Sequence, residues 1–306
     1  MNDTLDPSPV RRAVAFVGIG NMGFGMAARL LSLGWPVHVC DLDPQRCQDA
    51  AALGAVVHAS PAEAGAALPD GGLMVVAVVD AGQCQQVMWG PGGASASLRA
   101  GQTVMWCPTI APGDVEALAL RLATQGVDSL DAPMSGGPAR ARDGSMSLML
   151  AGPHAVVQRH TDVLQALSHQ VFVLGERLGD GARTKLVNNL LAGINLVGAA
   201  EVLALASNLG LDLSQTLDVI ERSSGQSWIG ADRMRRAIAG DLSPRAHMTL
   251  LAKDTRLANE AAAEAGFSGP LGARAAAVFR AACESGLSEL DDGALLAFLQ
   301  QHGQIR

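Results

Sequence analysis

Short runs of β-branched and other apolar residues alternate with helix-length segments rich in alanine and leucine over the first 175 residues. A continuous apolar run between two helices is typical of a parallel strand that is covered on both faces. The pattern therefore predicts an α/β fold, in which a doubly wound parallel sheet lies between two layers of helices. Strands are expected at residues 13–18, 36–40, 73–79, 103–107, 127–132, 147–152 and 170–175.

After residue 175 the strand-like runs stop, and the pattern is helical to the end of the chain. A long helix is expected first, at about residues 182–209, followed by further helices of an all-α C-terminal domain. The predicted division is a flexible lead-in at 1–12, an α/β domain at 13–176 and a helical substrate and oligomerisation domain at 177–306. The apolar residues that give the long helix its spacing are Leu186, Leu190, Ile194 and Val197.

This long helix is apolar on more than one face. One face is expected to pack within its own domain, and another is free to meet a partner subunit. We therefore expect a homodimer or a homotetramer.

The composition is that of a compact protein with a large core, since 49% of the 306 residues are hydrophobic and 17% are charged. The net charge of −7 argues against a nucleic-acid partner, which requires a basic surface. The densest basic cluster lies at residues 232–237, and its three arginines scatter around a helix. We expect Arg233, Arg235 and Arg236 to form a solvated face.

Five cysteines without a C-x-x-C pair indicate reduced thiols and a cytoplasmic protein. The first ten residues lack the apolar segment of a signal peptide. The most apolar stretch, residues 190–206, contains Asn195 and Glu201 and is short for a membrane span, so no membrane partner is expected. No two histidines lie four residues apart beside a carboxylate, and no metal site is expected.

The sequence GIGNMG at residues 18–23 is a G-x-G-x-x-G motif between the first expected strand and a helix near residues 22–33. Gly18 permits a tight turn, Gly20 lets the backbone approach a pyrophosphate, and Gly23 lets the helix pack closely on the sheet. The N-terminus of that helix offers free N–H groups to phosphates. This context predicts a Rossmann dinucleotide site, to which Asn21 and Met22 also belong.

Asp41 ends the second expected strand, where an acidic side chain accepts hydrogen bonds from both ribose hydroxyls and repels a 2′-phosphate. Leu42 follows, at a position where an NADP-binding chain favours arginine. Asp43, directly before Pro44, is the better cap for the next helix, which leaves Asp41 for the cofactor. NAD is therefore expected rather than NADP, and Arg46 is the residue that opposes this interpretation.

Three further stretches resemble the β-hydroxyacid dehydrogenases, the family related to 3-hydroxyisobutyrate dehydrogenase. They are the substrate signature DAPMSGGPARARDGSMSLMLAG at 131–152, the catalytic segment GDGARTKLVNN at 179–189 and the second lysine motif AKDTRLA at 252–258. With the glycine motif, the resemblance extends from about residue 13 to 258. The stretch from SSGQSW onward looks most like the L-threonate dehydrogenase branch of the family.

The resemblance implies a Rossmann domain joined to a helical domain, with the active site in the cleft between them and Lys185 as the catalytic residue. Elementary chemistry points to the same residue, because burial lowers the pKa of an amine and allows it to act as a base. Such an amine can take the hydroxyl proton while hydride leaves the substrate carbon for the nicotinamide. Asn189, four residues on, lies on the same helix face.

By the same resemblance, Ser135, Gly136 and Gly137 hold the carboxylate of the substrate, for which a hydroxyl and uncovered N–H groups are suited. Lys253 resembles the family lysine that reaches towards cofactor and substrate, although Asp254 is equally suited to pair with it on a helix surface. Thr109 follows the strand where the family contacts the nicotinamide side of NAD; Cys107 stands where serine is commoner.

The expected function is therefore an NAD-dependent oxidoreductase acting on the 3-hydroxyl of a small acid such as L-threonate or 3-hydroxyisobutyrate. One alternative is an NADPH-dependent reductase of tartronate semialdehyde, succinic semialdehyde or a similar aldehyde acid. Another, of a different class, is a non-catalytic binding module of the same fold. The presence of Lys185 argues against this second alternative.

Overall fold

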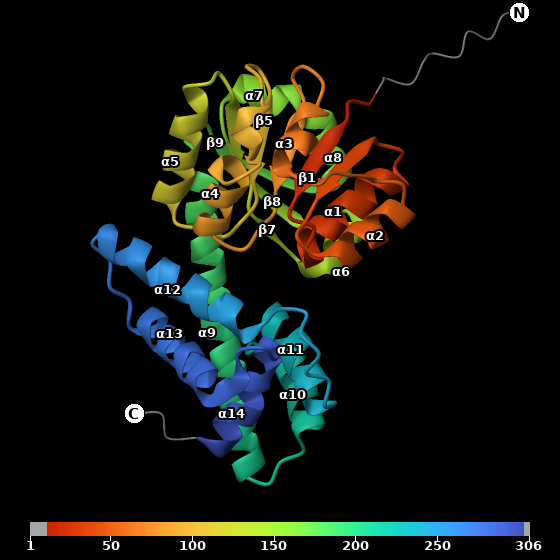
Figure 1. Cartoon of the computed structure of the whole chain (residues 1–306). Coiled ribbons are helices and arrows are strands. Elements are labelled where there is room, and N and C mark those ends of the chain that lie inside the picture. The colour runs from red at the N-terminus through yellow and green to blue at the C-terminus, as the bar shows by residue number, and fades with distance from the viewer. Residues whose placement is uncertain (1–10, 303–306) are drawn as a thin grey trace, which may run out of the picture. The chain divides into compact units, whose positions relative to one another are not determined.

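A computed structural model describes residues 11–302 of the chain, which divides into two compact units (Figure 1). The first unit ends at Ala182 and the second begins at Arg183, so the division falls inside a helix that begins at Asp180. The predicted limit at 176/177 lies before that helix. The expected lead-in falls outside the described residues except for Arg11 and Arg12.

The first unit contains a nine-stranded sheet in the order β3-β2-β1-β4-β5-β6-β8-β7, with β9 paired to β8. The strands from β3 to β6 are parallel, as predicted, but β8 runs antiparallel to β6 and β7. The expectation of a wholly parallel sheet is therefore wrong at this end of the sheet. The strands are β1 (Val14–Val17), β2 (Val37–Cys40), β3 (Val56–Val57), β4 (Leu73–Val76), β5 (Thr103–Trp106), β6 (Asp128–Asp131), β7 (Met134–Ser135), β8 (Ser147–Ala151) and β9 (Gln170–Gly175).

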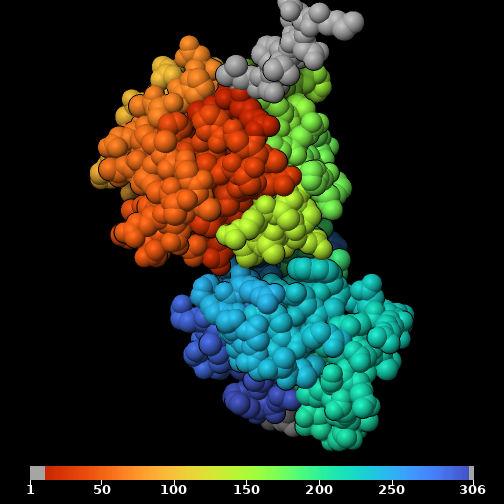
Figure 2. Space-filling model, turned by 90° about the vertical axis from the view of Figure 1, so that its right-hand side faces the viewer, coloured from red at the N-terminus to blue at the C-terminus, as the bar shows by residue number. Residues whose placement is uncertain are grey.

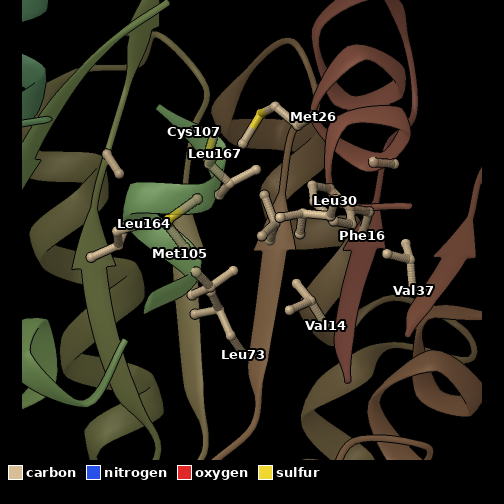
Figure 3. Packing of buried hydrophobic residues seen from close by; sticks show 14 of the residues in the cluster. Val14, Phe16, Met26, Leu30, Val37, Leu73, Met105, Cys107, Leu164 and Leu167 are labelled. Carbon is tan, nitrogen blue, oxygen red and sulfur yellow. The ribbon is translucent and has the colours of Figure 1, made fainter. Parts of the chain in front are cut away.

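Helices cover both faces of this sheet, because successive residues of each central strand point to opposite sides. In β1, Val14 and Phe16 pack with Leu30 in one cluster, whereas Ala15 and Val17 belong to the other (Figure 3). Helices α1 (Asn21–Ser32), α2 (Pro44–Ala52), α6 (Gly137–Asp143), α7 (His154–Arg159) and α8 (Thr161–Leu167) contribute to the first cluster. Helices α3 (Pro61–Ala66), α4 (Ala81–Trp89) and α5 (Pro112–Ala123) contribute to the second.

Helices α1 and α6 are more than 100 residues apart in the chain and lie side by side on the surface of the first unit (Figure 2). A glycine makes this approach possible, because a Cβ at Gly25 would lie 2.9 Å from the Cβ of Ala141. The contact holds the segment that follows Ser135 against the helix in whose first turn the glycine motif ends.

The second unit is built around the 29-residue helix α9 (Asp180–Asn208), drawn in green in Figure 1. Its residues Leu196, Ala200 and Leu203 are fully buried in a core shared with Phe279. The unit is helical as predicted, apart from an isolated bridge between His247 and Asp291. Its other helices are α10 (Leu213–Glu221), α11 (Trp228–Ile238), α12 (Met248–Glu264), α13 (Pro270–Ala282) and α14 (Leu295–Gln301), with short helical turns η2 (Cys283–Leu287) and η3 (Asp292–Ala294).

By length and composition α9 is the one helix among residues 11–302 that could cross a membrane, although its apolar run was expected to be too short. A core helix passes the same test, and the burial of Leu196, Ala200 and Leu203 identifies α9 as a core helix on one side.

The expectation of a solvated arginine face on α11 is wrong for two of its three arginines. Arg236 is buried and donates hydrogen bonds to the carboxylates of Asp241 and Asp291. Arg233 lies between Asp291 and Asp292, and only Arg235 is exposed. Carboxylates more than 50 residues away in the sequence turn this basic cluster into an internal network.

Candidate active site

The glycine motif forms an open cradle at the end of β1. Gly18 has a φ of +85°, and a Cβ there would lie 2.8 Å from Val78. A Cβ at Gly23 would lie 2.2 Å from the carbonyl oxygen of Gly18, so only glycine allows α1 to start so close to the strand. A Cβ at Gly20, in contrast, would meet nothing within 4 Å.

The first turn of α1 has no side-chain cap, so its backbone N–H groups face the open space beside Gly20. Asn21 and Met22 form this turn, and Asn21 is exposed. Uncapped N–H groups at a helix N-terminus next to a side-chain-free backbone fit a pyrophosphate. The residues present therefore suit a dinucleotide cofactor.

Asp41 lies directly after β2 and contacts this cradle. Its Oδ2 accepts a hydrogen bond from the backbone N–H of Ile19 at 2.6 Å, and its Oδ1 accepts one from Asp43 at 2.9 Å. Asp43 caps α2 by accepting hydrogen bonds from the N–H groups of Gln45 and Arg46, which confirms the expectation that Asp41 is not the cap. The side chain of Leu42 is fully exposed.

Arg46 is held beside the same cradle. Its guanidinium donates a hydrogen bond to Asn21 Oδ1 at 3.0 Å and lies 3.8 Å from the carboxylate of Asp43. A cation is thus present beside the first residue of α1, the helix that follows the glycine turn.

Lys185 is buried in the second unit, on the second turn of α9, with 7% of its surface exposed. Burial lowers its pKa from 10.5 to about 8; the carboxylate of Asp254 raises the pKa and the ammonium of Lys253 lowers it. The lysine is therefore poised to exchange a proton near neutral pH. The chain has two lysines, Lys185 and Lys253, and the other 20 of its 22 lysine and arginine residues are arginines.

Asn189 lies one turn after Lys185 and is also buried, with 8% exposed. Its side-chain nitrogen donates a hydrogen bond to Asp254 Oδ2 at 2.6 Å. The two helices approach closely at this point because a Cβ at Gly193 would lie 2.6 Å from Thr255, the neighbour of Asp254. A glycine one turn along α9 therefore brings Asn189 within reach of α12.

Asp254 is 6% exposed, and its Oδ1 accepts no hydrogen bond among the described residues. This oxygen lies 3.0 Å from Nζ of Lys253, an ion pair at the edge of the site rather than on an exposed helix surface. The sequence interpretation left Asp254 open as a surface partner of Lys253. A signal was present, since Asp254 occupies a place in the stripe of α12 that otherwise holds Leu251, Thr255 and Ala258.

Ser135 ends the short strand β7 and is partly exposed, and Gly136 and Gly137 follow it. Both glycines have positive φ, +125° and +79°, so the segment is a turn that other residues would adopt only with strain. A Cβ at Gly137 would meet nothing within 4 Å, which leaves its backbone open to a ligand.

Thr109 is half-buried two residues after Cys107, at the end of β5. Burial raises the pKa of the Cys107 thiol well above its usual range, and the nearby charge of Asp131 adds to this. Cys107 is thus a neutral core residue rather than a reactive thiol.

Asp131 is a buried carboxylate that the sequence interpretation did not single out. It accepts a hydrogen bond from the backbone N–H of Ala182 at 2.9 Å and so ties the first turn of α9 to the end of β6. Burial raises its pKa to about 6, although hydrogen bonds from the backbone N–H groups of Ala182, Gly179 and Gly181 lower the pKa in part. The available signal was an aspartate at the end of a strand, directly before the predicted substrate signature continues.

The structure thus brings the predicted residues together in two groups, one in each unit. In the first unit, Gly18, Gly20, Gly23 and Asp41 form a cradle suited to a dinucleotide. In the second, Lys185 and Asn189 share a buried cluster with Lys253 and Asp254, which can take up and release a proton. None of the described residues forms a group of three or more metal-ligating side chains.

Comparison with known proteins places both units in described families of domains. The model described as the NAD binding domain of 6-phosphogluconate dehydrogenase matches residues 13–175. The model described as the NAD-binding domain of NADP-dependent 3-hydroxyisobutyrate dehydrogenase matches residues 179–299.

Individual relatives match over almost the whole chain. An L-threonate dehydrogenase of Cupriavidus necator is 39% identical over 93% of this chain and 95% of its own. The crystal structure of a 3-hydroxyisobutyrate dehydrogenase from Salmonella typhimurium has a TM-score of 0.88 and 33% identity, covering 94% of this chain and 99% of its own. A structure of Psf3 in complex with NADP+ and 2-OPP has a TM-score of 0.84 and 27% identity, covering 94% and 99%.

Proposed function

Because the chain belongs to the β-hydroxyacid dehydrogenase family, we propose that Lys185 is the general acid–base of a hydroxyacid dehydrogenase whose preferred cofactor is NAD. The observation that carries the proposal is the burial of Lys185, with a pKa near 8, beside Asn189 and Asp254. At a pH of about 8, half of the molecules carry Lys185 as the neutral amine, which is the form that can accept a proton.

The proposed mechanism assigns one task to each group of residues. When bound, the nicotinamide accepts a hydride from the carbon that bears the hydroxyl group. The neutral amine of Lys185 accepts the hydroxyl proton as the carbonyl forms, and in the reverse direction its ammonium returns that proton. Asn189 donates a hydrogen bond to Asp254 and so fixes the carboxylate whose charge raises the pKa of Lys185.

The proposed substrate is a small 3-hydroxy acid, with its carboxylate at Ser135, Gly136 and Gly137. The open backbone at Gly137 and the hydroxyl of Ser135 support this assignment. L-threonate is the first candidate, because the L-threonate dehydrogenase of C. necator is 39% identical to this chain.

A substrate panel tests this proposal directly. The purified protein is assayed by nicotinamide absorbance with L-threonate, 3-hydroxyisobutyrate, D-glycerate and L-serine, each with NAD+ and with NADP+. Turnover of at least one 3-hydroxy acid is expected, with L-threonate fastest. No turnover of any acid, together with tight binding of a cofactor, would favour the non-catalytic binding module.

The cofactor preference is tested at Asp41. Replacement of Asp41 by serine should weaken NADH binding about tenfold, because the ribose hydroxyls lose a charged acceptor, and should bring NADPH binding closer to that of NADH. Fluorescence titration of both cofactors gives the two dissociation constants. Asp49→Ser makes the same change at an exposed position of α2, where the carboxylate accepts a hydrogen bond from Gln45, and serves as the control.

Arg46 supports the rival interpretation, a reductase that uses NADPH. Its guanidinium lies beside the first residue of α1, and the similar structure of Psf3 contains NADP+. Tighter binding of NADPH than of NADH by the unchanged protein would favour this rival and contradict the role given to Asp41.

The pH dependence of the reaction provides a further prediction. Oxidation needs the neutral amine of Lys185, so kcat/KM for oxidation should rise with pH through about 8 and then level off. Reduction needs the ammonium, and its rate should fall over the same range. A profile for the oxidation without a midpoint between about pH 7 and 9 would contradict the assignment of the base.

Two variants should move this midpoint in opposite directions. Asp254→Asn removes a negative charge that raises the pKa of Lys185, so the midpoint should shift to lower pH. Lys253→Met removes a positive charge that lowers the same pKa, so the midpoint should shift to higher pH. Glu260→Gln is the matched control, because it makes the same charge change at an exposed position of α12.

A further inference from the structure

The carboxylate of Asp131 is a buried group that has no part in the proton transfer proposed for Lys185. Its side chain lies at the carboxyl end of β6 and is almost completely buried. It accepts a hydrogen bond from the backbone N–H of Ala182 at 2.9 Å, and others from the N–H groups of Gly179 and Gly181. The first N–H groups of a helix have no partner within that helix. Asp131 therefore caps α9 from a strand 51 residues earlier in the chain.

The start of α9 is built into the first unit around this carboxylate. Ala182 is almost completely buried and belongs to the core of that unit. A Cβ at Gly181 would lie 2.9 Å from the carboxyl carbon of Asp131 and 2.6 Å from the carbonyl oxygen of Met149. Any larger residue would therefore push the helix away from the carboxylate. We call Asp131 and the N–H groups of Gly179, Gly181 and Ala182 the α9 clamp.

The negative charge of Asp131 lowers the stability of the fold. Burial raises its pKa from 3.8 to about 6 and the charge of Asp180 raises it further, although the N–H groups of the clamp lower it. Asp180 is itself paired with Arg177, and Cys107, which also faces the carboxylate, is a neutral thiol. A carboxyl whose pKa is raised by folding stabilises the fold at low pH, and this contribution is lost as the pH rises through about 6. A neutral side chain would be more stable at neutral pH, so the charge requires another reason.

The ionised form is the one that suits the clamp. A carboxylate offers acceptor lone pairs on both oxygens, whereas a protonated carboxyl or an amide turns a donor group towards the N–H groups. The carboxylate alone meets all three N–H groups without an opposing donor. These N–H groups belong to the linker and the first turn of α9, and Lys185 lies on the next turn. Because the division between the units falls after Ala182, α9 begins in the first unit and continues in the second.

We propose that Asp131 is a positioning residue of the dehydrogenase, whose carboxylate fixes the first turn of α9, and with it the turn that carries Lys185, to the end of β6. This inference rests on the proposed function, because it takes Lys185 as the proton acceptor. Ser135, which begins the proposed binding turn for the substrate carboxylate, follows Asp131 by four residues. Asp131 thus joins the segment that leads to this turn to the helix that carries the base. Misplacement of a reacting group by about 1 Å costs about 10²-fold in rate.

Asp131→Asn tests this role, because it removes the charge and keeps the shape of the side chain. At about pH 9, kcat for oxidation should fall about 10- to 100-fold, while the dissociation constant for NADH is unchanged. The midpoint of thermal unfolding should not fall, because a buried charge is removed. Loss of a purely structural cap would instead lower that midpoint. Asp128→Asn is the control at the other end of β6, where the carboxylate pairs with Arg159 at 2.7 Å and is 34% exposed, and it should leave kcat unchanged.

The pH profile of the unchanged protein provides a second test. Between about pH 6 and 8, the logarithm of kcat/KM for oxidation should rise with a slope of one, because Lys185 alone loses a proton. Below about pH 6 the slope should be two, because Asp131 must be ionised as well. Asp131→Asn should show a slope of one throughout, with circular dichroism confirming the fold at each pH. If this variant does not fold, the slope of the unchanged protein below about pH 6 still decides.

Hydrogen exchange tests the clamp without turnover. The peptide that contains Gly179 and Ala182 should exchange about tenfold faster in Asp131→Asn than in the unchanged protein, and at the same rate in Asp128→Asn.

Three results would overturn the role of Asp131 in a protein that oxidises a hydroxy acid. These are an unchanged kcat of Asp131→Asn, unaltered exchange of that peptide, or a slope of one below about pH 6 in the unchanged protein. Loss of kcat together with a lower unfolding midpoint would reduce Asp131 to a structural cap. If the unchanged protein oxidises no hydroxy acid, the proposed function itself is wrong, and the role of Asp131 falls with it.

Discussion

Replacement of Lys185 by alanine should lower kcat for the oxidation of the preferred hydroxy acid by about 10²- to 10⁴-fold, the usual contribution of a positioned general acid–base. The residue is buried, and burial gives it a pKa of about 8, so its amine is neutral at the pH where oxidation is fastest. No other amine of this kind is present, since the chain has one further lysine, Lys253.

Lys185→Arg sharpens this test. A guanidinium retains the positive charge and most of the length of the side chain but does not lose its proton in proteins. A base is therefore absent in this variant, and its kcat should be as low as that of the alanine variant. If the lysine only attracted the substrate carboxylate, the arginine variant would instead remain active.

The dissociation constant for NADH separates catalysis from folding in these variants. The dinucleotide cradle lies in the first unit, around Gly18, Gly20 and Asp41, whereas Lys185 belongs to the second unit. Binding of NADH should therefore stay within about threefold of that of the unchanged protein. Full activity of either variant with every hydroxy acid tested would remove Lys185 from the mechanism.

Short-range patterns predicted the parts of the molecule that short-range physics determines. The glycine motif is one example, because the turn at Gly18 and the close packing at Gly23 depend on neighbours in the same βα unit. The apolar strands and the long helix α9 are others, since burial on one or both faces leaves a direct trace in the sequence. The family resemblance then pointed to Lys185 and Asn189.

Contacts between distant segments could not be predicted in this way. The two-residue strands β3 and β7 are too short to give a pattern, and the reversal of β8 depends on the path of the chain after β6. The burial of Arg236 depends on Asp291, 55 residues later. In each case the local sequence is compatible with a solvated segment, and only the folded chain supplies the partner.

That arginine network should dominate the stability of the second unit. Asp291 is almost completely buried, and its Oδ2 accepts a hydrogen bond from Arg236 at 3.1 Å and one from the backbone N–H of Arg245 at 2.9 Å. Its Oδ1 accepts one from the N–H of Gly293 at 3.1 Å and lies 3.9 Å from Arg233. This carboxylate therefore lies between two arginines, each of which has a second acidic partner, Asp241 for Arg236 and Asp292 for Arg233.

Asp291→Ala is expected to destabilise the protein by about 3–5 kcal/mol, because the N–H donors of Arg236, Arg245 and Gly293 lose a buried acceptor, at a cost of at least about 1 kcal/mol each. For a unit of this size the midpoint of thermal unfolding should fall by roughly 10–20 °C. Asp218→Ala is the matched control: Asp218 pairs with the neighbouring Arg235 at 2.8 Å, but both side chains are about half exposed. Such a surface pair contributes at most about 1 kcal/mol.

The same variant should also affect the proton-transfer cluster, through the helix that carries it. Asp291 binds the segment directly before α12, and the backbone N–H of Met248, the first residue of α12, donates a hydrogen bond to Leu290. Asp254 lies on that helix and holds Asn189 beside the turn of Lys185. The unfolding midpoint from differential scanning calorimetry should therefore fall for Asp291→Ala and stay unchanged for Asp218→Ala. The value of kcat, measured at 15 °C where both variants are folded, should follow the same pattern. Equal unfolding midpoints of the two variants would show that the buried network contributes no more than a surface ion pair.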